Sequence, residues 1–112
     1  MKSFVAYQGP AFIIEWYYDS ELKSSALEYF LGLSPERQDQ VLKLFRLMGD
    51  RGRINNITKF RHEGDGVYAF KPKPDRFLCF FYKGKKVVVT NAFDKKQDKL
   101  PLSEKQRALG VR

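Results

Sequence analysis

Two adjacent lysines, Lys95 and Lys96, stand one residue beyond an apolar run with the composition of a β-strand. That run, residues 86–93, reads KVVVTNAF, and its β-branched residues favour a strand held within a sheet. Lysines on the end of such a strand would have a fixed position, unlike lysines in a flexible tail. Neighbouring ammonium groups in fixed positions suit the binding of a polyanion. The alternative is a solvated sheet edge whose lysines only face water.

The positive charge of the chain is concentrated in its second half. Residues 1–56 contain seven basic and seven acidic side chains, whereas residues 57–112 contain 14 basic and six acidic ones. The formal net charge of +8 at pH 7 therefore belongs entirely to the second half. This asymmetry predicts a surface for nucleic acid or for an acidic protein partner. A basic face that only keeps the protein in solution is the alternative.

Length and composition favour one folded domain that spans residues 1–112. With 43% hydrophobic and 15% aromatic residues, a chain of this length can bury a core. The single cysteine, Cys79, excludes an internal disulfide and a cysteine-based zinc site, and its apolar neighbours predict a buried thiol. The sequence has neither a Gly-rich phosphate loop nor a cluster at metal-ligand spacing, so we expect no cofactor and no metal. Since a signal peptide and a long apolar segment are both missing, we expect a cytoplasmic protein without a membrane partner.

The first half of the chain predicts a strand followed by a helical hairpin. Residues 11–18 are aromatic and β-branched, which is typical of a strand. Asp19 or Ser20 would cap a first helix that runs to about residue 31. The pair Ser34-Pro35 would begin a second helix, since serine is a good cap and proline suits the first helical position. Glycines at positions 49 and 52 would end that helix.

The second half predicts an antiparallel meander. Strands are expected at residues 57–62, 67–71, 76–83 and 86–93, and the turns between them are too short for parallel crossovers. Ser103 has capping-box spacing for a short last helix. The predicted fold class is α+β: a small antiparallel sheet, made of the N-terminal strand and a three- to four-strand meander, packs against the N-terminal helical hairpin. We expect Trp16 and the aromatic run at residues 77–81 to belong to its core.

Four segments of the chain resemble the RelE/ParE superfamily of toxins from bacterial and phage toxin–antitoxin modules. They are the helical hairpin that ends LSPERQDQVLKLFRLMGDRG, the strand GDGVYAFKP, the pair RFLCFFYKGKKVVVTNAF and the terminal FDKKQDKLP. The terminal segment is similar to the Phe-x-Lys-Lys-x-x-x-x-Pro signature of that family. The resemblance covers roughly residues 11–108 and is nearest to HigB-like and phage-derived members. It implies a RelE-like fold and a type II toxin with a cognate antitoxin as its partner.

The resemblance also implies a metal-independent endoribonuclease that cuts mRNA in the ribosomal A site. In the family reaction, the ribose 2′-OH attacks the adjacent phosphodiester. That reaction requires a base, cations near the phosphate and an acid for the 5′-oxygen. The matching positions are Lys71, Lys73, Arg76, Lys95 and Lys96, of which the first four are the predicted catalytic residues. Lys71 or Lys73 would be the base, Arg76 would clamp the phosphate, and Lys95 with Lys96 would stabilise its charge.

A lysine acts as a base only when it is deprotonated, and its ordinary pKa is about 10.4. Crowding by other cations would lower that pKa, so the clustering itself favours catalysis. The RNA would be held by Arg61, His62, Lys96 and Lys99. Each residue also has a simpler interpretation: Lys71 and Lys73 as exposed turn lysines, Arg76 as a surface partner of Asp75 or Asp94. His62, the sole histidine, is a further candidate for the acid or base, although we expect it at a strand end facing water.

The chain also departs from the pattern of the family. It lacks the C-terminal tyrosine or histidine that serves as the general acid in some RelE-like enzymes, and it has one histidine where HigB-like members often use several. The general acid is therefore unassigned. Two other functions stay open: a decayed, non-enzymatic protein that binds nucleic acid or an antitoxin, and a ParE-like gyrase inhibitor. The rich basic face favours RNA.

Overall fold

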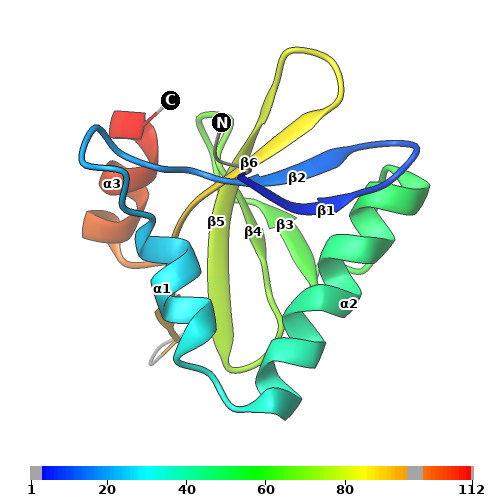
Figure 1. Cartoon of the computed structure of the whole chain (residues 1–112), viewed down its shortest axis with the longest axis horizontal. Coiled ribbons are helices and arrows are strands. Elements are labelled where there is room, and N and C mark those ends of the chain that lie inside the picture. The colour runs from blue at the N-terminus through cyan, green and yellow to red at the C-terminus, as the bar shows by residue number, and fades with distance from the viewer. Residues whose placement is uncertain (1–3, 96–99, 112) are drawn as a thin grey trace.

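The computed structural model describes residues 4–95 and 100–111 of the chain, and its centre is a six-stranded sheet. The strand order is β1-β2-β6-β5-β4-β3, and three helices flank the sheet in the described residues (Figure 1). The elements are β1 (Val5–Gln8), β2 (Ile13–Trp16), α1 (Ser25–Leu31), α2 (Pro35–Arg51), β3 (Phe60–His62), β4 (Tyr68–Phe70), β5 (Asp75–Tyr82), β6 (Lys86–Asp94) and α3 (Leu102–Val111). The α+β class predicted from the sequence is confirmed.

The sheet combines the predicted meander with an N-terminal hairpin. Strands β3, β4, β5 and β6 pair antiparallel in chain order, as their short turns require. The strand expected at residues 11–18 is confirmed as β2, but the N-terminal strand β1, with which it forms an antiparallel hairpin, was not predicted. The predicted sheet was wholly antiparallel, but β2 lies beside β6 and runs parallel to it, so the sheet is mixed. The long connection that a parallel pair needs is supplied by α1, α2 and the strands β3 to β5, which lie between β2 and β6 in the chain.

Helix α1 begins later than predicted. Its cap is Ser24, whose Oγ accepts a hydrogen bond from the Leu27 amide at 3.2 Å. Asp19 instead accepts hydrogen bonds from the amides of Glu21 and Lys23, at 2.8 and 3.0 Å, and so closes a turn before the helix. An aspartate that bonds backbone amides two and four residues ahead stabilises a turn as readily as a helix cap.

Helix α2 begins at the predicted serine–proline pair and ends at Gly52, whose φ of 80° needs a glycine. Gly49 was wrongly predicted to end it and lies inside the helix. Helix α3 begins at Leu102, so Ser103 is its second residue and not its cap. Figure 1 shows α1 and α2 diverging in a V from the loop that joins them, with α3 apart from both near the C-terminus.

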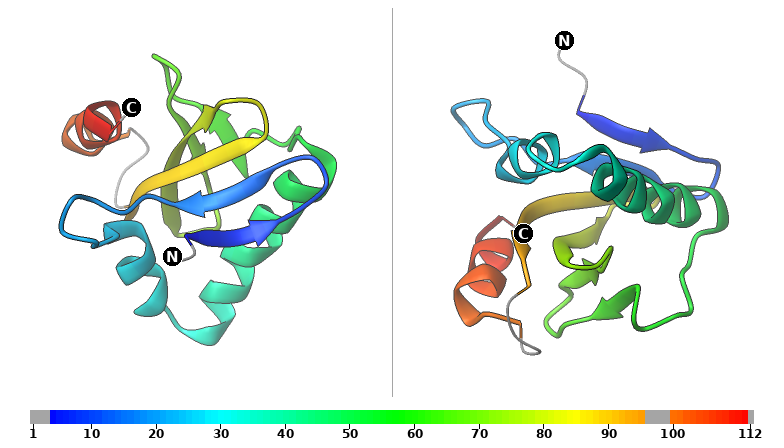
Figure 2. Two further views of the ribbon diagram at one scale, coloured as in Figure 1. Left: turned by 45° about the horizontal axis from the view of Figure 1, so that its top comes forward. Right: turned by 90° about the horizontal axis from the view of Figure 1, so that it is seen from below.

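Each face of the sheet carries its own apolar cluster. On the face covered by α1 and α2, the main cluster includes Phe45 and Met48 of α2 and Phe77 of β5, together with Trp16. On the opposite face, Ala108 of α3 packs against Val67, Ala69 and Leu78. Figure 2 shows α3 separated from the other two helices by the strands. The predicted core is confirmed except for Phe81, which is 37% exposed.

A β-bulge in β6 changes which of its side chains face the helices. Cys79 of β5 pairs with Val89, but Leu78 pairs with Asn91, so Thr90 is an extra residue in β6. Val89 belongs to the cluster under α1 and α2, whereas Asn91 reaches the other face and donates a hydrogen bond to Glu104 Oε1 of α3 at 2.9 Å. From Thr90 onward, the alternation of β6 is therefore reversed.

Gly9 and Gly49 make a close backbone contact where the β1–β2 turn meets α2. The amides of Ala11 and Phe12 donate hydrogen bonds to the carbonyl oxygen of Gly49, at 2.8 and 3.0 Å. A Cβ atom added to Gly9 would lie 2.2 Å from the backbone carbon and oxygen of Gly49. Only glycine at position 9 allows this approach, which fixes the N-terminal hairpin against the helix.

Candidate nucleic-acid interface

Five basic side chains line one hollow on the face of the sheet opposite α1 and α2. The hollow has a volume of about 240 Å³, and Ile57 and Thr58 complete its lining. The basic residues are Arg61, Lys71, Lys73, Arg76 and Lys95. We refer to this site as the basic hollow. All four predicted catalytic residues lie in it, together with one of the predicted RNA-binding residues.

Strand alternation explains why these side chains converge. Phe70 of β4 and Phe77 of β5 are paired and belong to the cluster under the helices. Lys71 directly follows Phe70, and Arg76 directly precedes Phe77. Because neighbouring residues of a strand point to opposite faces, both cations face the side away from the helices. In the same way, Arg61 follows Phe60, which is buried in the helix-side cluster. Lys95 follows β6, where the bulge has already reversed the alternation.

Lys71 has a lowered pKa in this setting. The main cause is burial of its ammonium group, and the charge of Arg76 lowers the pKa further, as do those of Arg61 and Lys95. Glu63 opposes the effect. The Lys71 Nζ also donates a hydrogen bond to the carbonyl oxygen of Ile57 at 3.2 Å, which holds the amine at the hollow. Burial and neighbouring cations thus ease its deprotonation, as the sequence predicted for clustered lysines.

Arg76 is held at the floor of the basic hollow and is only 6% exposed. Its Nη1 donates a hydrogen bond to the carbonyl oxygen of Asp75 at 2.9 Å. Burial lowers the pKa of this arginine, against the charges of Glu63 and Asp75, but a guanidinium stays protonated in proteins. Its forked donors can bind two phosphate oxygens at once.

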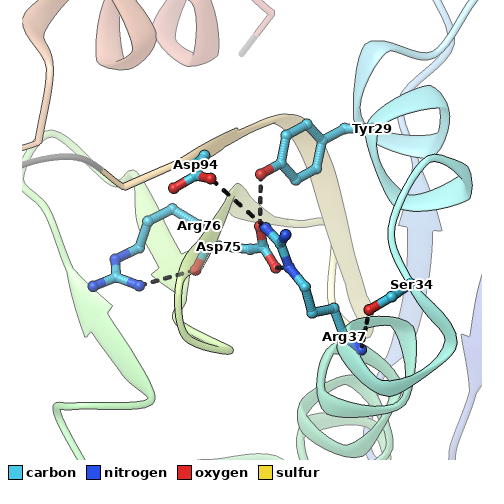
Figure 3. Close-up of polar contacts among 6 residues, drawn as sticks. All are labelled: Tyr29, Ser34, Arg37, Asp75, Arg76 and Asp94. Carbon is cyan, nitrogen blue, oxygen red and sulfur yellow. Dashed lines mark hydrogen bonds and ion pairs between the residues drawn. The ribbon is translucent and has the colours of Figure 1, made fainter.

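The carboxylate of Asp75 points away from the basic hollow. It is fully buried on the helix side, where it accepts hydrogen bonds from Tyr29 Oη at 2.6 Å and from Arg37 Nε at 3.0 Å (Figure 3). Burial and this carboxylate raise the pKa of Tyr29, so the phenol stays protonated. The simple interpretation of Arg76 as a surface partner of the Asp75 or Asp94 carboxylate is therefore not what the structure shows, because Arg37 contacts both carboxylates.

His62 lies outside the basic hollow. It is adjacent to Arg61 in β3, so its side chain belongs to the opposite face, where its ring lies 4.6 Å from that of Tyr68. Its Nε2 accepts a hydrogen bond from the Gly66 amide at 3.3 Å. His62 is exposed, as expected, but it does not join the five cations. The other predicted RNA-binding residues, Lys96 and Lys99, lie outside the described residues.

Sequence reasoning missed Glu63 and the partners of Asp75. Glu63 is two residues from Arg61, and a period of two places both on one face, so the strand pattern contained a usable signal. Its charge acts on both Lys71 and Arg76. Asp75 lies 46 positions from Tyr29 and 38 positions from Arg37 in the chain, and no local sequence pattern predicts contacts over such separations.

A larger hollow of about 570 Å³ lies elsewhere on the molecule and differs in chemistry. Most of its lining is aromatic or aliphatic, including Trp16, Tyr82 and Val88. Its lysine, Lys86, lies 3.5 Å from the carboxylate of Glu15, which neutralises it. This hollow is less suited to a phosphate than the basic hollow is.

Two features are absent from residues 4–95 and 100–111. None of the helices there has the apolar stretch that a bilayer-spanning segment requires. Nor do three side chains of His, Cys, Asp or Glu gather there as metal ligands would. Cys79 is buried, and burial raises the pKa of its thiol, in agreement with the inert cysteine predicted.

Comparison with known protein families matches residues 28–111 to the family described as phage derived protein Gp49-like (DUF891). The matched region contains α2, β3 to β6, α3 and every residue that lines the basic hollow. The comparison with curated proteins found no match. The match covers most of the chain, and the chain therefore belongs to the Gp49-like phage-derived family, a toxin–antitoxin-associated family related to RelE-like toxins.

Proposed function

We propose that this protein is the toxin of a type II toxin–antitoxin module and a metal-independent, ribosome-associated endoribonuclease. The observation that supports this best is the convergence of cationic side chains from β3, the β4–β5 loop, β5 and the end of β6 on one hollow. Preorganised cations of this kind stabilise the charge that develops on a phosphate during cleavage. Membership of a toxin–antitoxin-associated family supports the biological setting.

In the proposed reaction, deprotonated Lys71 takes the proton of the ribose 2′-OH. The 2′-oxygen attacks phosphorus while the bond between phosphorus and the 5′-oxygen breaks. The departing 5′-oxygen takes a proton from water, so the products are a 2′,3′-cyclic phosphate and a 5′-hydroxyl end. Arg76 and Lys95 stabilise the charge on the non-bridging oxygens, and Arg61 holds the strand. Lys73 is the second candidate for the base.

A second candidate function is RNA binding without cleavage. It is favoured by the composition of the basic hollow, whose described lining contains neither histidine nor tyrosine to protonate the 5′-oxygen. The sole histidine of the sequence, His62, faces the other side of the sheet. A protein with this surface would bind a phosphate backbone but leave it intact.

Single-turnover cleavage of labelled mRNA on programmed ribosomes separates the two functions. We expect cleavage by the wild type and a rate at least about 10²-fold lower for Lys71→Ala with Arg76→Ala, because a general base contributes at least that much. The control is Lys43→Ala with Arg46→Ala, which removes the same charges from the exposed surface of α2 and should cleave normally. Undiminished cleavage by the first double variant would refute the site. Binding by the wild type without cleavage would support the second function.

The family also suggests an antitoxin as a partner. We expect induced expression of this chain alone to arrest growth and coexpression with the product of the adjacent reading frame to restore it. Mapping transcript ends in arrested cells then tests mRNA as the target. DNA breaks without new transcript ends would instead indicate a ParE-like action on gyrase.

A further inference from the structure

A polar cluster on the helix side of the sheet lies directly behind the basic hollow. Its centre is the fully buried carboxylate of Asp75 at the start of β5. Arg37 of α2 approaches it with two donors: Nε donates to Oδ2 at 3.0 Å, and Nη2 donates to Oδ1. Tyr29 of α1 adds a third hydrogen bond to Oδ1 at 2.6 Å. Both helices therefore hold the first residue of β5 (Figure 3).

The same arginine also reaches the neighbouring strand. Asp94, the last residue of β6, pairs directly with Asp75. Like charges at directly opposed positions of adjacent strands repel each other. The Nη2 atom of Arg37 lies 3.8 Å from Asp94 Oδ2, so this guanidinium supplies positive charge to both carboxylates. Arg37 thus offsets the repulsion between the two acidic strand ends and helps them to lie side by side.

Each of these aspartates directly precedes a cation of the basic hollow. Arg76 follows Asp75, and Lys95 follows Asp94, so alternation turns both cations to the opposite face. Two hydrogen bonds fix these residues to the backbone at the start of β5. Arg76 Nη1 donates to the Asp75 carbonyl at 2.9 Å, and the Lys95 amide donates to the Pro74 carbonyl at 3.0 Å. The positions of the two aspartates therefore determine where the two cations lie.

We propose that Arg37 is a positioning residue. Its forked guanidinium binds the carboxylates of Asp75 and Asp94 on the helix side of the sheet. These contacts set the spacing of Arg76, Lys95 and Lys71 in the basic hollow on the other side. Arg37 itself touches no substrate in this arrangement. The consequence for RNA binding rests on the function proposed above. The effect on the pKa of Lys71 does not depend on that function, because it requires only that Arg76 move.

The test compares the wild type with Arg37→Gln, Arg37→Lys and Arg46→Gln. The last variant removes the same charge from an exposed position of the same helix and is the matched control. Two quantities are measured for each folded variant: the pKa of Lys71, from the pH dependence of its side-chain carbon resonances, and the affinity for a short single-stranded RNA. Backbone amide spectra establish that each variant is folded.

We expect Arg37→Gln to raise the pKa of Lys71 towards the ordinary lysine value, because Arg76 no longer lies as close to it. We expect its RNA affinity to fall about tenfold, the effect of losing roughly one charged contact. Arg46→Gln should leave the pKa of Lys71 unchanged. Arg37→Lys keeps the positive charge but loses the two parallel donors of the guanidinium, so it should shift the pKa of Lys71 in the same direction. This variant also replaces Arg37→Gln in the test if Arg37→Gln does not fold.

The outcomes separate the two proposals. A Lys71 pKa that stays at the wild-type value in the folded Arg37 variants would overturn the positioning role. A raised pKa in a protein whose wild type binds no RNA would support the positioning role and refute the proposed function instead. A raised pKa together with weakened RNA binding would support both.

Discussion

Asp75 and Arg76 are consecutive residues of β5, yet their charged groups lie on opposite faces of the sheet. The Asp75 carboxylate bonds to Tyr29 and Arg37 on the helix side, whereas the Arg76 guanidinium lies in the basic hollow. The peptide unit between these two residues links the two sites, because Arg76 also donates a hydrogen bond to the Asp75 carbonyl. Stability and phosphate recognition are therefore coupled at this point, and substitutions can be chosen that affect one or both.

Replacing Asp75 by asparagine tests the stability of the helix-side cluster. We expect Asp75→Asn to lower the free energy of unfolding by about 2–3 kcal/mol, since hydrogen bonds to charged groups contribute about 1.5–3 kcal/mol each. Asp94→Asn is the control, because that carboxylate is 46% exposed and lies 3.8 Å from Arg37, so its loss should cost about 0–1 kcal/mol. Urea unfolding at neutral pH measures both. Equal losses would contradict the central role of Asp75.

Replacing Lys71 by methionine should separate stability from activity. The folded state lowers the pKa of Lys71, so its partly buried ammonium destabilises the fold at every pH below that lowered pKa. The penalty is relieved as the pH rises through the lowered pKa towards the unfolded value of about 10.4. We expect Lys71→Met to raise the melting temperature at pH 7, with a gain that shrinks at higher pH, and to abolish cleavage. A lower melting temperature at pH 7 would contradict this.

Glu63 should set the pH dependence of the proposed base. Its negative charge raises the pKa of Lys71 against the effects of burial and Arg76, so Glu63→Gln should lower that pKa further. The rise of the cleavage rate with pH would then move to lower pH. Asp65→Asn is a control from the same turn, since Asp65 is exposed and lies 3.1 Å from Lys105. Rate–pH profiles of both variants provide the measurement.

Arg61 and His62 should differ in their contribution to RNA binding, although they are neighbours in β3. A cation that contacts phosphate changes the dependence of log K on log salt by about 0.7 per contact for single strands. We expect Arg61→Ala to reduce the slope by about that amount and His62→Ala to leave it unchanged, because His62 faces away from the basic hollow. Binding titrations at several salt concentrations decide this. An equal change for both would place RNA on a different surface.

The contact of Gly9 with Gly49 predicts a large effect from a small substitution. Gly9→Ala would place a carbon 2.2 Å from the backbone of Gly49, and the backbone cannot yield as a flexible side chain can. We expect a loss of about 1–3 kcal/mol in the free energy of unfolding, the usual cost of overpacking. Gly110→Ala is the control, since a carbon added at Gly110 meets no atom of the described residues within 4 Å. Similar losses for both would show that the hairpin can move away from α2.

Local sequence patterns predicted the meander and the face of several functional residues, but not the long-range contacts. The aromatic and β-branched runs around Phe77 and Val88 located β5 and β6, and the clustered cations of residues 71–76 do share one hollow. The hairpin partner β1 was missed because β2 alone satisfied the strand pattern. The cap of α1 was misplaced because Asp19 stabilises a turn with the same type of bond. The ion pair of Arg37 with Asp75 depends on tertiary packing, which no periodicity encodes.

The bulge that accommodates Thr90 decides the sign of the charge that β6 presents at the basic hollow. With strict alternation from Val89, Asp94 would face the hollow and Lys95 would face the helices. The bulge exchanges them, so that Lys95 lines the hollow and Asp94 approaches Arg37. If Thr90 entered the regular ladder instead of bulging, the charge presented at the hollow would therefore change sign although the composition of the chain stayed the same. For a small basic domain of this kind, strand register counts as much as lysine content in determining whether an anion is attracted or repelled.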